Sequence, residues 1–321
     1  MQGAWIELIV HSPLLMLLAV LLAYVAPLPD SYHPLTFFRF FAQRLGQKVN
    51  PDPDRSRQQQ RLSGALAIAV AILPWLLILI AFLQLSALPQ VFEAILLYLL
   101  LDIRSKRQRI LKLQHALQQQ QLSLSRDLAS MSLLRQTRTL SALGLSKAAI
   151  ESLWLNFSQI WLATLFWFLL VGIWPALVIR LLAILQQEWS PKLQHNRDFG
   201  AAAAWLSNWL LKPGYWLCFI LICIRLRCRR SVQRYRQLKN TYFHRAQLAC
   251  LAAVSASLSC RLGGPVLYNT DKLQRDRIGI EDAEPDHLIL RKALYQQQQL
   301  TWFSLLLLLI YALLWWIVHH L

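Results

Sequence analysis

An Arg-Leu-Gly-Gly-Pro string that starts at Arg261 carries residue types that could do chemistry. Gly263 and Gly264 could offer backbone N–H groups to a phosphate, with the guanidinium of Arg261 as the counter-charge. The same string is equally typical of a tight turn between a buried helix and a loop. Both interpretations are open at the level of the sequence.

Glu151, Arg135 and Thr137 are further candidates, and each has a functional and a structural interpretation. Glu151 stands beside the start of an apolar block, where it suits either a catalytic base or an interfacial cap. An ionisable group this near hydrocarbon favours a functional role. Arg135 and Thr137 suit either the orientation of a phosphate or the capping of a helix.

Familiar catalytic motifs are missing from the sequence. It contains no Walker loop, no G-x-S-x-G and no H-E-x-x-H. The five cysteines form no C-x-x-C pair. Cys218, Cys223 and Cys228 are spaced five apart, which turns each about 140° from the last on a helix. We therefore expect cysteines that pack rather than bind a metal.

Composition places these residues in a membrane protein. The chain has 321 residues, of which 56% are hydrophobic and 15% charged, and its net charge is +17. Soluble domains carry about 25% charged residues. A nucleic-acid groove would need basic residues interleaved with aromatic ones on a soluble module, so no nucleic-acid partner is expected. The basic run that follows Ile224 predicts contact with anionic membrane lipid.

The apolar residues form blocks that predict an all-α, polytopic transmembrane protein with helical loops. A span needs about 20 mostly apolar residues. We expect one integral membrane domain over residues 1–321. Strand-like alternation is nearly absent, and residues 261–286 read as an extended loop. The expected spans are residues 5–26, 62–83, 88–103 (a short one), 153–173, 201–224 and 300–321.

The distribution of charge predicts the orientation in a bacterial inner membrane. With the N-terminus outside, loops 27–61, 104–152 and 225–299 face the cytoplasm and hold 29 of the 33 Lys and Arg residues. This threading places residues 174–200 outside. Either residues 153–185 form a re-entrant hairpin instead, or the segment takes no part in a cytoplasmic site.

Several short motifs, in order, resemble the CobD/CbiB family of cobalamin-biosynthesis membrane proteins. The matches extend over about residues 33–268. They are His33-Pro34, the Arg135-Gln-Thr stretch, Glu151-Ser-x-x-x-Asn156, Phe199-Gly200, and the Arg-Leu-Gly-Gly-Pro string with Tyr268. The resemblance implies catalytic roles for Glu151 and Asn156. It implies substrate or phosphate binding by Arg135, Thr137, Arg261, Gly263, Gly264 and Tyr268.

The resemblance also implies an activity, that of an adenosylcobinamide-phosphate synthase. Such a ligase attaches aminopropanol, or its phosphate, to the corrin carboxylate of adenosylcobyric acid in an amide-forming step with ATP and Mg²⁺. The corrinoid and the amine would be the partners of the chain. Activation of a carboxylate needs cations on the nucleotide and carboxylates to hold Mg²⁺.

The chain departs from the family pattern at positions where an acidic residue is expected. The neutral residues there are Gln136, Leu155, Gln159, Gln186, Ser207 and Asn208. An amide cannot replace a carboxylate at a hard-cation site without loss of the charge that binds the metal. The metal ligands therefore stay unassigned.

Two hypotheses account for these departures. In the first, Mg²⁺ and amine handling have moved to retained groups, which are Glu151, Asn156, Asp198, Asp271, Asp276, Glu281 and Asp282. In the second, catalysis is lost and the scaffold is kept, as in a non-catalytic membrane signalling protein resembling AmpE.

Overall fold

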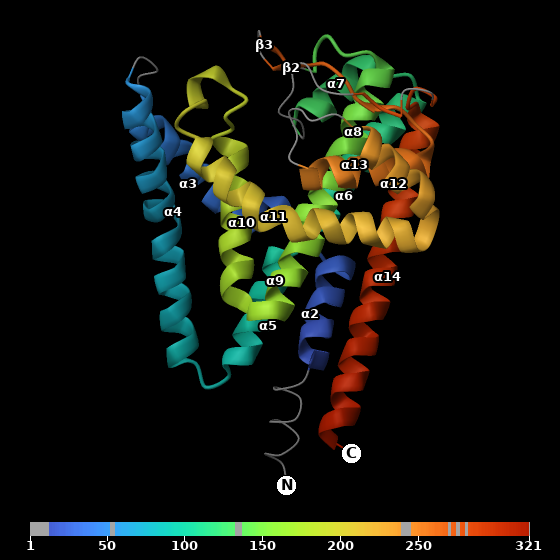
Figure 1. Cartoon of the computed structure of the whole chain (residues 1–321). Helices are drawn as coiled ribbons and strands as arrows, with labels where there is room; N and C mark the ends of the chain where they lie inside the picture. The colour runs from blue at the N-terminus through green and yellow to red at the C-terminus, as the bar shows by residue number, and fades with distance from the viewer. Residues whose placement is uncertain are drawn as a thin grey trace. The chain divides into compact units, whose positions relative to one another are not determined.

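The computed structural model of the chain describes residues 13–51, 55–131, 137–238, 245–268, 271–273, 277–279 and 282–320. Helices dominate these residues (Figure 1). Contacts between Cα atoms divide the chain into two compact units. Unit 1 comprises residues 1–104, 167–207 and 301–321, and unit 2 comprises residues 105–166 and 208–300.

Unit 1 is built from helices that pack on α10. Helix α10 contacts α3, α4 and α5, and α2 packs on α5. The elements that begin in this unit are α2 (Pro13–Val25), the 3₁₀ turn η1 (Asp30–Tyr32), α3 (Pro34–Val49), α4 (Arg57–Leu85), α5 (Pro89–Leu100), α10 (Ile173–Glu188), η3 (Gln194–Asn196) and α11 (Ala201–Ile222).

Unit 2 carries the remaining helices and four short strands. Helix α13 is buried at Ala246 and from Leu248 to its end, and it packs on α8 and α12. Helix α6 (Ile103–Gln118) enters this unit at its third residue. The elements that begin here are α7 (Leu122–Ser130), α8 (Ala142–Asn156), the π-helix η2 (Phe157–Ala163), α9 (Thr164–Val171), the π-helix η4 (Cys223–Arg227), α12 (Cys228–Gln237), α13 (Arg245–Leu258), β1 (Leu262–Gly263), β2 (Val266–Tyr268), β3 (Asp271–Leu273), β4 (Arg277–Ile278) and α14 (His287–His320).

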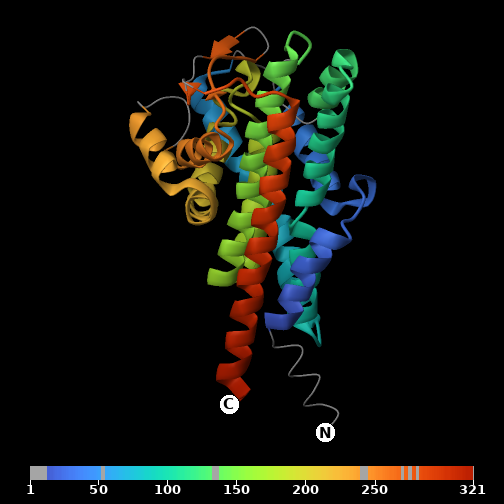
Figure 2. The same cartoon turned by 90° about the vertical axis from the view of Figure 1, so that its right-hand side faces the viewer.

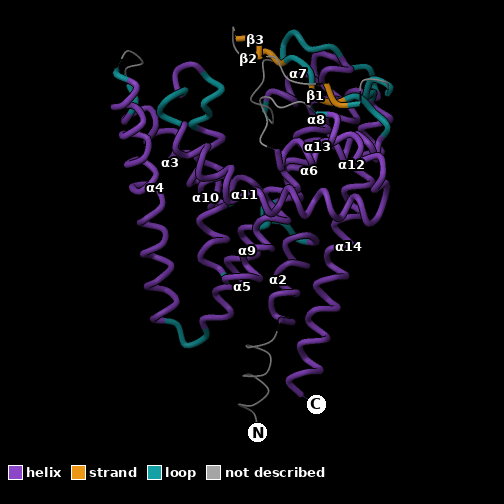
Figure 3. Tube along the Cα trace, in the orientation of Figure 1, coloured by secondary structure: helices purple, strands orange, loops and turns teal. Residues whose placement is uncertain are grey.

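The strands correct the expectation of an extended loop over residues 261–286. Strand β1 pairs antiparallel with β4, and β2 pairs antiparallel with β3 (Figure 3). Each strand has only two or three residues. Such short pairs lack the run of alternating residues by which strands are found in a sequence.

Four helices of the described chain are long and apolar enough to cross a membrane. They cover Arg57–Leu85, Ala142–Val171, Ala201–Arg225 and His287–Val318. They contain the expected spans 62–83 and 201–224, and most of 153–173 and 300–321. The fold is thus that of a multi-pass, all-α membrane protein.

The two remaining expected spans are shorter in the fold. Helix α5 has 12 residues, or about 18 Å at 1.5 Å per residue, against about 30 Å of hydrocarbon. Of the first expected span the described part is α2, and residues 5–12 lie outside the described residues. Whether either segment crosses a membrane stays a prediction.

Within unit 2, α11 runs across the direction of α14, although α11 is long and apolar. In Figure 1 the part of α11 in unit 2 runs across the view, and in Figure 2 the same segment is seen end-on. The part of α14 in the same unit runs from top to bottom in both views. The two helices therefore do not form a parallel pair of spans.

The chain reverses direction at Gly172, between α9 and α10. This glycine has φ +103°, a backbone conformation that side chains disfavour. No heavy atom lies within 4 Å of the position that a Cβ would take, so the backbone conformation and not a lack of space favours glycine here. Residues 153–185 are therefore two helices joined by one residue, as in the hairpin alternative.

The end of this hairpin packs on α3 and α4. Glu188 forms an ion pair with Arg39 at 3.1 Å, and the indole N–H of Trp189 donates to Ala42 O at 2.9 Å. Farther on, Asp198 binds Arg61 at 2.8 Å. Residues that touch cannot lie on opposite sides of a bilayer. The threading that put 174–200 outside and 27–61 inside is therefore wrong for this segment.

Close backbone contacts explain the Phe199-Gly200 pair of the sequence. A Cβ on Gly200 would lie 1.7 Å from Trp189 O, and a Cβ on Gly64 would lie 2.0 Å from Phe199 O. Phe199 itself is fully buried and meets the Trp189 ring edge-on at 5.1 Å. Only glycine fits at these two crossings.

The reversal at Gly172 predicts the accessibility of single cysteines. Cysteines introduced as Lys48→Cys and Gln194→Cys should react with a membrane-impermeant maleimide from the same side of oriented vesicles, because their segments are packed together. Ala87→Cys, at the far end of α4, should react from the opposite side. The unsubstituted chain supplies the background from its native cysteines. Labelling of Lys48→Cys and Gln194→Cys from opposite sides would contradict the hairpin.

Candidate functional site

Glu151 lies at the centre of unit 2 and is held by the Arg-Leu-Gly-Gly-Pro string. Helix α8 begins after Ser141, whose hydroxyl accepts from Gly144 N at 3.2 Å. Two and a half turns later Glu151 is 1% exposed. Its Oε1 accepts a hydrogen bond from the backbone N–H of Gly263 at 2.9 Å. A buried carboxylate is tolerated only with such partners.

The glycines of the string have left-handed backbone conformations. Gly263 has φ +71° and Gly264 has φ +84°. A Cβ on Gly264 would meet the ammonium of Lys147 at 3.6 Å, so this glycine leaves the cation close to the backbone. Because the N–H of Gly263 already serves Glu151, it is not free to bind a phosphate. The tight-turn interpretation accounts for Gly263.

Lys147 is a site residue that was not singled out from the sequence. It precedes Glu151 by four residues on α8, which places both side chains on one face of the helix. That spacing was the available signal, and it was hidden among many basic residues. The structure brings Lys147, Glu151 and the glycines together, although 112 residues separate Glu151 from Gly263.

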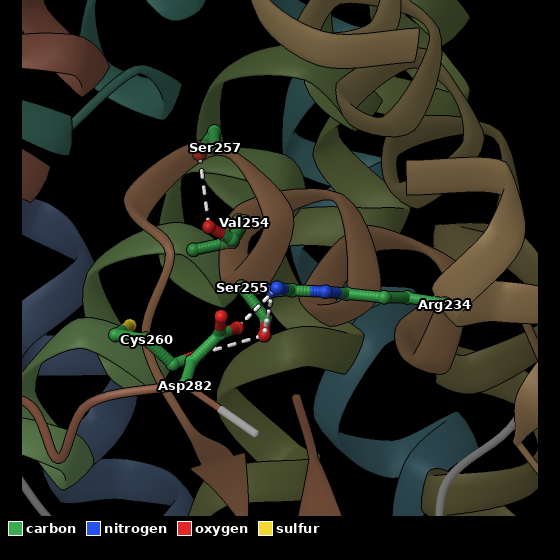
Figure 4. Close-up of polar contacts among 6 residues, drawn as sticks. All are labelled: Arg234, Val254, Ser255, Ser257, Cys260 and Asp282. Carbon is green, nitrogen blue, oxygen red and sulfur yellow. Dashed lines mark hydrogen bonds and ion pairs between the residues drawn. The ribbon is translucent and has the colours of Figure 1, made fainter. Parts of the chain in front are cut away.

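Arg234 fixes the loop from the other side (Figure 4). Its Nη1 donates to Ser255 Oγ at 2.7 Å, and its Nη2 forms an ion pair with Asp282. Ser255 Oγ in turn donates to Cys260 O at 2.7 Å. These contacts hold the end of α13 at the point where the string begins. The side chain of Arg234 is 13% exposed, so the expectation that it contacts lipid is wrong for this residue.

Gly279 makes room for this cluster. Its φ is +69°, and a Cβ there would lie 2.7 Å from Ser255 Oγ and 2.8 Å from Asp282 Oδ2. The glycine therefore allows the loop before α14 to approach the ion pair.

Cys260 is unsuited to nucleophilic chemistry. Burial raises the pKa of its thiol to about 12, with the nearby charge of Asp282 adding to the rise and Arg234 and Lys147 opposing it. The thiol is therefore protonated at neutral pH, and the thiolate is the reactive form.

Arg261 points to a more open region. Its Nη1 binds Glu284 Oε1 at 3.0 Å, and its backbone N–H donates to Ala283 O at 2.9 Å. Both side chains of the ion pair are partly exposed. The guanidinium is thus held by Glu284 and is partly exposed to solvent.

Other sequence candidates lie elsewhere or have structural partners. Asn156 donates to Ser152 Oγ at 3.0 Å on its own helix, and it is turned about 140° from Glu151. Thr137 Oγ1 donates to Arg126 O at 3.1 Å, which ties the segment before α8 to α7. Arg135 and Gln136 lie outside the described residues. For Tyr268 only the backbone, in β2, is described.

Four of the six neutral residues at positions where the resemblance implies an acid lie in hydrogen-bonded groups. Gln159, in the π-helix η2, donates to Tyr215 Oη at 2.6 Å. Gln247 donates to the same oxygen at 3.0 Å and to Asn208 Oδ1 at 3.3 Å. In unit 1, Ser207 Oγ donates to Gln186 Oε1 at 2.8 Å. Leu155 is half-buried and belongs to neither group.

Close packing positions the first of these groups. A Cβ on Gly214 would lie 2.3 Å from Ser158 O, so α11 crosses the π-helix at backbone contact. Wide turns of this kind are frequent at functional sites. Here the turn carries Gln159 beside Tyr215.

These residues do not fit a protein-held Mg²⁺ ion. Among the described residues, no group of three or more His, Cys, Asp or Glu side chains could hold a metal. Near the string, Glu151 accepts from a backbone N–H, and Asp282 and Glu284 are paired with arginines. In the two hydrogen-bonded groups, amides and hydroxyls stand where Mg²⁺ would prefer carboxylate oxygens.

Comparisons with known proteins agree with the motifs. The family model described as CobD/Cbib protein matches residues 16–296. A "Cobalamin biosynthesis protein CobD" from Chromobacterium violaceum is 28% identical over 271 residues, which is 84% of this chain and 87% of the relative. The protein of the same name from Stutzerimonas stutzeri is 31% identical over 264 residues, 81% of this chain and 85% of the relative. No solved structure matches significantly.

Replacement of Glu151 should show whether its charge or its acceptor oxygen matters. Glu151→Ala leaves the buried Gly263 N–H without an acceptor and should lower the free energy of unfolding by roughly 1–3 kcal/mol. Glu151→Gln keeps an acceptor oxygen and should lose less than half as much. Thermal unfolding of the detergent-solubilised protein, followed by tryptophan fluorescence, measures both.

Glu284→Ala is the matched control, because it removes a partly exposed carboxylate and should change stability by about 0.5 kcal/mol or less. Equal losses for Glu151→Ala and Glu151→Gln would mean that the charge, not the hydrogen bond, holds the loop.

Proposed function

This chain belongs to the CobD/CbiB family, and from that premise we propose that it attaches aminopropanol, or its phosphate, to the carboxylate of adenosylcobyric acid. The coarser role, in cobalamin biosynthesis, rests on the family match and on relatives that carry that name. The finer step is the activity of an adenosylcobinamide-phosphate synthase.

The observation that carries the proposal is the assembly around the Arg-Leu-Gly-Gly-Pro string. It unites two motifs of the family, the Glu151 helix and the string itself, at one hydrogen bond. It adds the cations of Lys147 and Arg261 at the edge of the same loop. A nucleotide and a phosphorylated amine both carry anionic phosphate groups, and cations beside a rigid backbone suit such groups.

We assign the residues roles that their positions allow. Arg261, at the open side of the loop, would bind a phosphate of a substrate. Lys147 would add a second positive charge. Glu151, which is buried, would position the loop through Gly263 rather than touch the substrate.

A carboxylate is a poor acceptor for an amine and has to be activated, and we propose that ATP does this. The described residues do not fit a protein-held Mg²⁺, and the roles given above are independent of the metal. A corrinoid and an amine are the proposed substrates. The membrane lipid of a bacterial inner membrane is the proposed surroundings, with the basic loops on the cytoplasmic side.

Fewer observations support the regulatory alternative. The neutral groups around Tyr215 and Gln186 are compatible with it. However, the curated relatives that match carry the biosynthetic name, and the family match extends over most of the chain.

Complementation tests the proposal. In a strain that lacks its own synthase and is supplied with cobyric acid, the chain should restore cobalamin-dependent growth. Failure by protein that is well expressed and inserted in the membrane would overturn the enzymatic function.

Arg261→Ala should then lower turnover at least tenfold in membranes that contain the protein, because a charge-assisted contact to a substrate phosphate is lost. Glu284→Ala removes the partner of Arg261 but keeps its charge, and it should retain most of the activity. Equal losses in the two variants would reduce Arg261 to a structural ion pair.

A further inference from the structure

Two glutamine-rich stretches far apart in the sequence meet in unit 2. Residues 118–121 and 296–299 are each a run of four glutamines. The first stands at the end of α6, and the second lies in the first part of α14. Between these helices the structure has a groove of about 620 Å³, within the usual range for ligand sites.

The groove is lined by amides and cations. Four glutamines contribute, namely Gln114, Gln118, Gln119 and Gln298. Two arginines add positive charge, and no carboxylate is among the lining residues. The lining therefore suits a ligand with both amide groups and a negative charge.

Part of this lining is already arranged. Arg107 Nη2 donates to Gln298 Oε1 at 2.7 Å and so links α6 to α14. Gln114 Nε2 donates to Gln118 Oε1 at 3.3 Å. These bonds orient the amides before any ligand arrives, which reduces the entropy lost on binding.

Other lining groups face outward. Arg291 is exposed and has no ion pair or hydrogen bond with another described residue, which leaves its charge available to a ligand. Tyr295 is 61% exposed, so its ring offers a flat apolar surface in the same groove. An aromatic face and a cation side by side suit a large, flat, anionic molecule.

We propose that the groove between α6 and α14 binds the amide-bearing edge of the corrinoid substrate. This inference rests on the proposed function. Adenosylcobyric acid carries carboxamides around a flat macrocycle and one carboxylate. Side-chain amides pair with carboxamides as donor and acceptor at once, and Arg291 supplies a counter-charge to the acid.

A nucleotide is the rival occupant, since its phosphates would also seek Arg291 and Arg107. The lining favours the corrinoid, because four amides offer a polyphosphate few of the cationic or backbone N–H contacts that phosphate sites use. The glutamines instead match a ligand that is itself rich in amides.

Equilibrium dialysis of the full-length protein in detergent tests the groove, with dicyanocobyric acid as the probe and its visible absorbance as the signal. The double variant Gln118→Leu, Gln119→Leu should bind about tenfold more weakly, because the amides are replaced by apolar groups of similar size. Arg291→Gln should weaken binding by a similar factor. It should have a smaller effect on dicyanocobinamide, in which the acid is masked as an amide.

The matched controls lie on the same helices. Gln108→Leu on α6 and Lys292→Gln on α14 change exposed residues that do not line the groove. Both should bind the probe as the unsubstituted protein does.

Three outcomes would overturn the inference. If the groove variants bind the probe as tightly as the unsubstituted protein, the groove is not the corrinoid site. The proposed function still stands in that case, provided the unsubstituted chain complements growth. Loss of ATP binding with unchanged corrinoid binding in the same variants would assign the groove to a nucleotide. An unsubstituted chain that binds no corrinoid and does not complement would overturn the proposed function as well.

Discussion

A carboxylate buried in a helical unit has to be satisfied by a donor, and in this protein that donor is the backbone of a glycine loop. Glu151 is almost completely buried, and Gly263 N–H is a partner that holds it. The bond joins α8, which carries Lys147, to β1, which follows Arg261. It therefore helps to set where these two cations lie.

Two polar clusters of unit 2 differ in charge. Around the end of α13, charged groups pair through Arg234 and Asp282, and a serine completes their hydrogen bonds. Along the apolar helices η2 and α11, the hydrogen-bonded group is neutral, with Tyr215 at its centre. Neutral amides cost less than carboxylates in apolar surroundings. Gln159 and Asn208 therefore take part in a hydrogen-bonded network that needs no charge.

In both units, glycines allow two backbone segments to approach each other closely. Gly200 lets the backbone after Trp189 pass next to it, and Gly214 lets α11 touch the π-helix. Gly172 turns the chain back after α9, so that Glu188 and Trp189 reach α3. In each case the absence of a side chain, rather than a specific bond, decides which segments can meet.

The sequence by itself determined the class of the protein and the identity of its family. Hydropathy is a property of a short window of residues, so the blocks at 62–83 and 201–224 predicted long apolar helices correctly. The Glu151 motif and the glycine string could likewise be recognised as they stand in the sequence. The packing of α10 against α3 could not be predicted from the sequence, because it depends on one positive φ at Gly172. The sequence could not predict the burial of Arg234 either. A basic run predicts contact with lipid, and only the structure shows that Asp282, far away in the sequence, pairs with this arginine. Only the tertiary structure decided which distant groups pair, because pairing depends on where the chain turns and not on local composition.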